Sequence, residues 1–78
     1  MTQDDIQLLK DRTNGTVRIN CTDGEVIIAK VQLVSEEDED VVYDLISTTK
    51  ESRYEKHDEQ PAYLIKFQDI RSVEAIDA

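Results

Sequence analysis

The chain has 78 residues and a formal net charge of −9, from 18 Asp or Glu and 9 Lys or Arg. A chain this short builds one core, so residues 1–78 are expected to form a single domain. The negative charge disfavours nonspecific nucleic-acid binding, which depends on Lys and Arg contacts to phosphates. Small cores leave little surplus stability, so help from oligomerisation is expected.

Cys21 is the only cysteine, which excludes an intramolecular disulfide and a CxxC metal or redox site. A reducing, cytoplasmic setting fits this cysteine usage best. The segment Met1–Arg12 has no apolar run of signal-peptide length. No stretch of about 20 apolar residues is present either, so we expect no contact with a membrane.

A short helix is predicted at Asp4–Arg12, where acids occupy the first turn and cations the last. Ile6 and Leu9 lie three residues apart and share one face. Asn14-Gly15 is expected to end the helix, because Gly accepts the left-handed conformation that follows a helix end.

From Thr16 the apolar residues alternate, which predicts a half-buried strand followed by a hairpin turn at Asp23-Gly24. A longer second strand is predicted at Glu25–Val34. The side chains expected on the buried faces of the two strands are Val17, Ile19 and Cys21, then Ile27, Ala29, Val31 and Leu33.

The run Ser35–Asp40 is expected to be a solvated turn, because consecutive acids would place like charges side by side in a ladder. Val41–Thr48 is rich in β-branched and aromatic residues and is predicted as the third strand. The polar segment Thr49–Gln60 is predicted as a loop that Pro61 closes.

The fourth strand is predicted at Ala62–Phe67 and the fifth at Ser72–Ile76, after a corner at Gln68–Arg71. The fourth strand is apolar on both faces, whereas a barrel strand normally has one wet face. We expect a neighbouring subunit to cover its outer face.

The predicted fold is therefore mainly β, with a short N-terminal helix and a five-stranded, strongly bent antiparallel barrel. A small barrel suits these elements because it removes exposed sheet edges.

This order of elements resembles the Sm/LSm family, which includes bacterial Hfq, over nearly the whole chain. Val17-Arg18-Ile19 followed by Asp23-Gly24 is similar to the family's first strand and turn, and Ala29-Lys30-Val31 falls where the family often has Gly-x-Leu. Other small SH3-like barrels share the strand count and turn placement, so an SH3-like barrel is the alternative.

The resemblance implies a ring in which strand four pairs with strand five of the neighbour. The residues that it assigns to this oligomer interface are Tyr63, Leu64, Ile65, Phe67 and Val73.

The resemblance also implies an RNA pocket, built in the family from an Asn before strand three and an Arg-Gly pair after strand four. Here Asp40 occupies the Asn position, and Lys66 and Phe67 occupy the Arg-Gly positions. Asp lacks amide donors, and Phe fills space where Gly lets a nucleotide approach. The equivalent pocket is therefore expected to be degenerate.

Other chemistry-bearing residues have plainer interpretations. His57 lies among acids that could orient an imidazole, but one histidine in a loop is usually solvated. Cys21 alternates with apolar residues and is interpreted as a core filler. Glu36–Asp40 offers carboxylates to a hard cation, but it lacks the Gly and bidentate Glu of an EF-hand loop. We predict no metal and no cofactor.

Cations and tyrosines are the remaining candidates for nucleic-acid contacts. If the Sm-like topology holds, the cations Lys66, Arg71 and Arg18 could line one rim, although cations on a solvated strand face are ordinary. Tyrosines can stack on bases. The chain has three tyrosines, of which only Tyr54 lies in the predicted loop. Tyr43 and Tyr63 are more economically interpreted as core or interface residues.

The sequence contains no Gly-rich phosphate loop, no Gly-x-Ser-x-Gly and no His/Cys cluster, so we predict that the protein is not an enzyme. The leading hypothesis is a non-catalytic binding or assembly module that forms a homo-oligomer and contacts a basic protein partner. The alternative is an Sm-like RNA binder with a degenerate base pocket.

Overall fold

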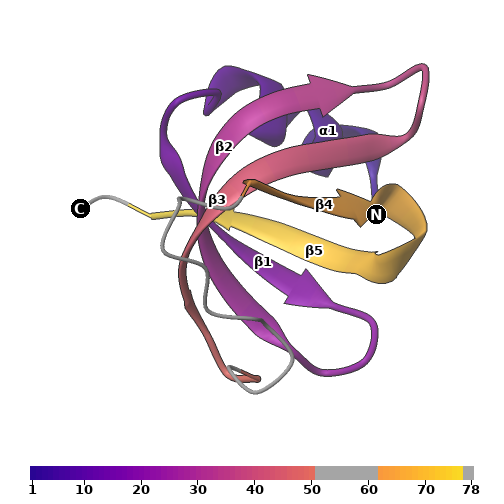
Figure 1. Cartoon of the computed structure of the whole chain (residues 1–78). Helices are drawn as coiled ribbons and strands as arrows, with labels where there is room; N and C mark the ends of the chain where they lie inside the picture. Colours follow the sequence, from indigo (N-terminus) through magenta and orange to yellow (C-terminus); the bar gives the residue numbers. More distant parts are fainter. Residues whose placement is uncertain (51–61, 77–78) are drawn as a thin grey trace.

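The computed structural model describes residues 1–50 and 62–76, which form one short helix and five strands (Figure 1). The elements are α1 (Gln3–Asp11), β1 (Thr16–Cys21), β2 (Val26–Ser35), β3 (Asp40–Thr48), β4 (Ala62–Lys66) and β5 (Ile70–Ala75). One 3₁₀ turn, Phe67–Asp69, joins β4 to β5. The mainly-β prediction with one N-terminal helix is confirmed, and the bounds differ by about two residues at most.

Helix α1 begins at a capping box formed by Thr2 and Asp5. The Asp5 N–H donates to Thr2 Oγ1 (3.2 Å), and the Asp5 carboxylate accepts from the Thr2 N–H (3.1 Å). Leu9 is fully buried and anchors the helix in the core. The left-handed conformation after the helix belongs to Asn14 (φ 70°) and not to Gly15, since Asn also tolerates this region. Within the described residues, no helix has the length and apolar character that a membrane crossing needs.

The first two strands form the predicted hairpin. Val17, Ile19 and Cys21 are buried on one face of β1, which confirms the alternation and the structural place of the cysteine. At the turn, Gly24 has a φ of 92°, a conformation that side chains rarely adopt. The Glu25 N–H donates to Asp23 Oδ1 (3.0 Å), so the aspartate stabilises the turn that it begins.

All five strands lie in one antiparallel sheet with the order β4-β3-β2-β1-β5. In the described part of the chain no ladder joins β4 to β5, so the sheet is not closed and these two strands are its edges. Figure 1 shows β2 and β3 curving along their length, with β4 and β5 connected at one end.

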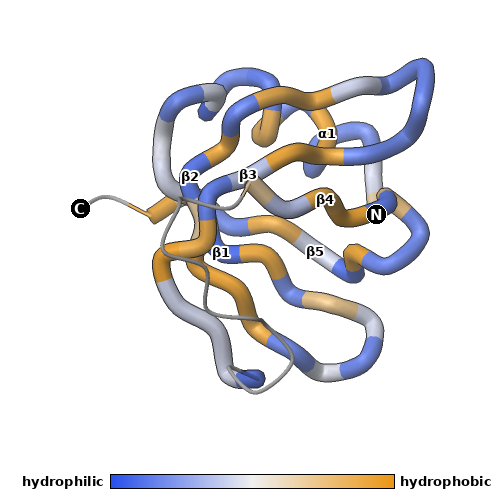
Figure 2. Tube along the Cα trace, in the orientation of Figure 1, coloured by the Kyte–Doolittle hydropathy of each residue, from blue (hydrophilic) through white to orange (hydrophobic). Residues whose placement is uncertain are grey.

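The core is formed mainly by α1, β1, β2, β3 and β5, and Figure 2 shows the apolar residues distributed along the strands. Its buried hydrophobic residues are Leu9, Val17, Ile19, Cys21, Ile27, Ala29, Val31, Val41, Tyr43, Ile70 and Val73. Strand β4 contributes only half-buried side chains, Tyr63 and Ile65, which pack against this core. β4 is therefore the most weakly covered strand of the sheet.

The edge of β5 is partly covered by the N-terminal helix. Val73 lies in the middle of β5, and its N–H donates to Asp5 Oδ1 (3.3 Å). Asp5 therefore stabilises the start of α1 and also occupies a backbone donor of the sheet edge. Both contacts use the same carboxylate, which ties the helix to the strand.

The acidic segment is only partly the solvated turn that was predicted. The turn is stabilised by the Asp38 N–H, which donates to Ser35 Oγ (3.1 Å), and Glu39 adopts a positive φ of 55°. Asp40, however, begins β3 and is 8% exposed. The prediction that Asp40 is solvated was wrong, because the residue pairs across the sheet with the cation of Lys66.

Candidate interaction site

Strand β4 presents one apolar side chain to solvent at the edge of the sheet. β4 pairs with β3 in a regular register that runs from Asp40 opposite Lys66 to Asp44 opposite Ala62. Tyr63 and Ile65 pack towards the core, and Leu64 between them is 55% exposed. The predicted two-sided apolar character of this strand is therefore present, and its outer side chain is Leu64.

Leu64 is the end of an apolar row that crosses three strands. The register places Val42 of β3 beside Leu64 on one side and beside Leu33 of β2 on the other. Leu33 is 59% exposed, similar to Leu64, and Val42 is half-buried between them. We call Leu33, Val42 and Leu64 the outer apolar row.

A β-bulge in β2 creates this row. Val31 pairs with Tyr43, and Leu33 pairs with Val42, so Gln32 is an extra residue without a partner in the ladder. The Gln32 side-chain amide donates to Asp44 Oδ2, which holds the bulge against β3.

Because of the bulge, the predicted burial of Leu33 was wrong. Leu33 was expected to share the buried face of Val31, but the extra residue turns it to the outer face. Val34 packs against the core in its place. A single inserted residue is enough for this exchange because side chains alternate with a period of two.

The residues that the resemblance assigns to an RNA pocket, Asp40, Lys66 and Phe67, lie close together in this structure. Lys66 Nζ lies 3.3 Å from Asp40 Oδ2 and also donates to the Asp38 carbonyl (3.5 Å). The Phe67 N–H donates to the Glu39 carbonyl (2.8 Å). Each of these contacts joins the end of β4 to the start of β3.

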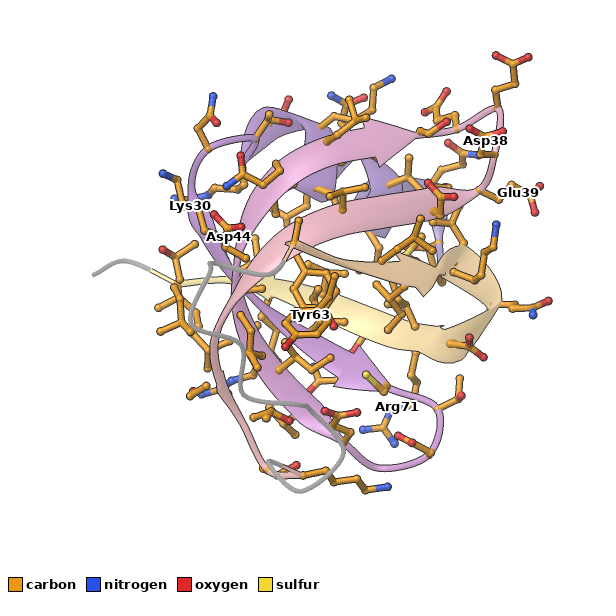
Figure 3. The ribbon with its side chains drawn as sticks, in the orientation of Figure 1. Lys30, Asp38, Glu39, Asp44, Tyr63 and Arg71 are labelled. Carbon is orange, nitrogen blue, oxygen red and sulfur yellow. The ribbon has the colours of Figure 1, made fainter. Side chains whose placement is uncertain are left out.

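These contacts leave little basic character at that end of β4. The Lys66 ammonium is already paired with a carboxylate, and the Phe67 ring packs against the core. Figure 3 shows Asp38 and Glu39 at the same end of the molecule and Arg71 away from them. Arg18 of β1 pairs with Glu74 of β5 (3.2 Å), two strands that are separated from β4 by β2 and β3 in the sheet. The three predicted cations therefore do not line one rim.

The five predicted interface residues do not share one surface. Leu64 is exposed, whereas Tyr63, Ile65 and Phe67 are half-buried against the core. The Tyr63 ring lies 6.0 Å from that of Tyr43, centroid to centroid. Val73 is 6% exposed and belongs to the core beneath β5. Leu64 is the exposed member of this set.

A cavity of about 380 Å³ lies between β4 and the β1–β2 turn. Its walls include three acidic residues, Asp23, Glu25 and Asp69, and two tyrosines, Tyr43 and Tyr63. This size falls within the range of small-molecule pockets. Lys66 also lines the cavity, but the carboxylates outnumber it, which makes the cavity better suited to a cationic group than to an anionic one.

Three side chains at this cavity lie close enough to share a cation. One ligand atom each of Cys21, Asp23 and Glu25 lies within 4.8 Å of the others. Glu25 is 5% exposed and accepts a hydrogen bond from Thr48 Oγ1, and Asp23 pairs with Lys50 Nζ (3.3 Å). Both carboxylates also have protein partners, which give them a structural role at this turn. The buried Cys21 thiol is likewise placed as a packing group.

Sequence reasoning missed the cavity and the burial of Glu25, since an acid directly after a hairpin turn usually faces solvent. The signal that could have indicated it is Thr48, a hydroxyl near the end of β3 within reach of that position. His57 and Tyr54, two other candidates from the sequence, lie outside the described residues.

The chain was compared with known proteins at three levels. No family model, no curated protein and no solved structure matches it.

Proposed function

We propose that this protein is a non-catalytic assembly module that forms a homo-oligomer through β4 and contacts a basic protein partner. The observation that carries the proposal is the outer apolar row, which ends at β4, an edge strand of the sheet that the described residues form, with Leu64 55% exposed. An apolar side chain beside unpaired strand backbone favours the addition of another strand.

The mainly-β architecture supports an Sm-like or SH3-like barrel as the scaffold. One short helix and five antiparallel strands are the elements that such a barrel requires. The single cysteine is buried in the core, which is compatible with the reducing cytoplasm as the site of action. The buried thiol also supports a structural use of Cys21 over a nucleophilic one.

Assembly is tested by measuring the mass of the protein in solution. Light scattering after size-exclusion chromatography should give a multiple of the 9.0 kDa chain mass at concentrations of tens to hundreds of micromolar. If the measured mass equals that of a single chain at every concentration in this range, the homo-oligomer is removed from the proposal.

The net charge of −9 and the acidic cavity support a basic partner. A fluorescent oligolysine peptide is a suitable probe, and its affinity should fall as salt rises because screening weakens charge attraction. An oligoglutamate peptide of equal length should show no binding.

Two charge-matched variants locate the partner surface. Asp69 lines the cavity and Glu37 lies in the acidic turn. Replacing either residue by Lys changes the net charge by the same amount. Asp69→Lys should weaken oligolysine binding several-fold more than Glu37→Lys. Equal effects would show that only the overall charge matters and that the cavity has no special part.

RNA binding is the alternative, since the structure brings Asp40, Lys66 and Phe67 together. The Lys66–Asp40 ion pair argues against it, because a paired ammonium is a poor phosphate ligand. Fluorescence anisotropy with short uridine- or adenosine-rich RNA near physiological salt decides between the two. Submicromolar affinity would favour the RNA binder over the protein-interaction module.

A further inference from the structure

We propose that two copies of the chain pair antiparallel along β4, about a two-fold axis that passes beside Leu64, and form a closed dimer. This inference rests on the proposed assembly function and specifies its geometry. The occupant of the β4 edge is a second copy of β4, and β5 takes no part in the contact.

The outer apolar row favours this pairing because it becomes continuous across the dimer. Centring the contact on Leu64 places Leu64 of one copy directly beside Leu64 of the second copy. The rows then join in the order Leu33–Val42–Leu64 and Leu64–Val42–Leu33. Six apolar side chains on one face shield each other from water, where each chain alone exposes Leu33 and Leu64.

In the same register, the core-facing side chains of one β4 lie beside the core-facing side chains of the second, and the outer side chains lie beside outer ones. β4 has five residues with Leu64 at its centre, so Tyr63 pairs with Ile65 of the second copy and Ala62 pairs with Lys66. Tyr63 and Ile65 both pack towards the core side, and the other three residues share the outer face. No side chain has to change faces for the two sheets to join.

Charges at the two ends of β4 are complementary in this arrangement. Lys66 of one copy lies opposite Ala62 of the second copy, and Ala62 pairs with Asp44 in its own sheet. Lys66 and Asp44 of the second copy are then about 10 Å apart between Cα atoms, across a small alanine. Lys66 keeps its pair with Asp40 and Asp44 its hydrogen bond from Gln32, so the approach adds attraction between opposite charges without a new ion pair, and the two-fold axis repeats it.

The opposite edge explains why the assembly closes at two chains. A head-to-tail arrangement needs β5 as the acceptor of β4, but the Val73 N–H at the centre of β5 already donates to Asp5 (3.3 Å). Helix α1 would have to release this contact before a strand could add there. Pairing β4 with β4 leaves this helix contact in place in each copy.

Two chains with a charge of −9 each repel one another at long range. The dimer should therefore tighten as salt rises, whereas the affinity for oligolysine should fall. Opposite salt dependences separate self-association from partner binding in one set of measurements.

The first test measures the dimer Kd by sedimentation equilibrium for two variants. Each variant replaces one apolar side chain of similar exposure by Asp. Leu64→Asp places two carboxylates side by side on the axis and should raise the dimer Kd about 100-fold or more. Ile46→Asp is the matched control, since Ile46 is 57% exposed but lies outside the outer apolar row. Its Kd should stay close to that of the unmodified protein.

The second test uses disulfide formation, which remains informative if Leu64→Asp fails to fold. In a Cys21→Ala background, Leu64→Cys should form a disulfide-linked dimer on mild oxidation, because paired residues meet the distance that a disulfide needs. Leu33→Cys should form no such disulfide, because the two copies of residue 33 are five strand spacings, or about 24 Å, apart in the joined sheet.

A third cysteine position distinguishes the two-fold dimer from a ring. In a head-to-tail assembly, Leu64→Cys would not link to itself and would instead link to a cysteine placed on β5 of the next chain, for example Glu74→Cys. That result would overturn the two-fold geometry while leaving the proposed homo-oligomer in place. A protein that stays monomeric at hundreds of micromolar would overturn both.

Discussion

The two edges of the sheet, β4 and β5, are strands of similar length with opposite surroundings. β5 contributes Ile70 and Val73 to the core, and Asp5 of α1 accepts a hydrogen bond from its backbone. β4 contributes only half-buried side chains and turns Leu64 to solvent. The comparison teaches that the fold protects part of one edge with its own helix, whereas we propose that a second chain covers the other.

The largest expected effect comes from truncating one apolar side chain on each edge. Ile70→Ala should lower the free energy of unfolding by about 3 kcal/mol, because it leaves a cavity in the core. Leu64→Ala should cost less than about 1 kcal/mol in dilute solution, where self-association does not contribute. Urea denaturation measures both, and equal losses would contradict the difference between the edges.

The helix contact at β5 is tested by removing the shared carboxylate. Asp5→Ala should cost about 1.5 kcal/mol, since it removes the capping box and the acceptor for the Val73 N–H. Asp4→Ala, in the same helical turn, should cost about 0.5 kcal/mol or less. Hydrogen exchange at Val73 should accelerate in the first variant alone. A protected Val73 amide in Asp5→Ala would show that another group covers this edge.

The ion pair beside β4 is more buried than the one beside β5, so removing its cation should lower the free energy of unfolding more. Lys66→Met leaves the buried Asp40 carboxylate without its cation and should cost about 1 kcal/mol. Arg18→Met breaks a pair with Glu74 in which both partners are exposed, and should cost about 0.3 kcal/mol. Thermal unfolding at low and moderate salt measures the two costs, and a larger loss for Arg18→Met would reverse the order.

The smallest effect is expected away from both edges. Glu37→Ala, in the turn between β2 and β3, should change the free energy of unfolding by no more than about 0.5 kcal/mol. It should also leave the solution mass unchanged. A larger change would mean that the acidic turn, and not only the two edges, contributes to stability or assembly.

The alternating pattern of the sequence was sufficient to predict the strands and most of their buried faces. Val17, Ile19 and Cys21 follow the expected alternation in β1, and the Asp23-Gly24 turn is where it was predicted. Here each local signal agrees with the tertiary structure, since a hairpin needs only neighbouring residues to form.

The candidate site was harder to predict because it depends on contacts between strands. The Gln32 bulge has no marker in the sequence, since a glutamine among apolar residues fits a regular strand equally well. Leu33 therefore appeared buried when it is exposed. Asp40 appeared solvated because its cation, Lys66, lies in a distant part of the chain.

The contact between Asp5 and Val73 has a consequence for how the protein folds. The two residues are 68 positions apart, and β1 also pairs with β5 across a similar separation. Contacts this distant in sequence close large loops and slow folding, so we expect refolding in milliseconds to seconds, not microseconds. Until β5 is in place, the sheet has two open edges, and this is the stage at which chains are most exposed to mispairing with one another.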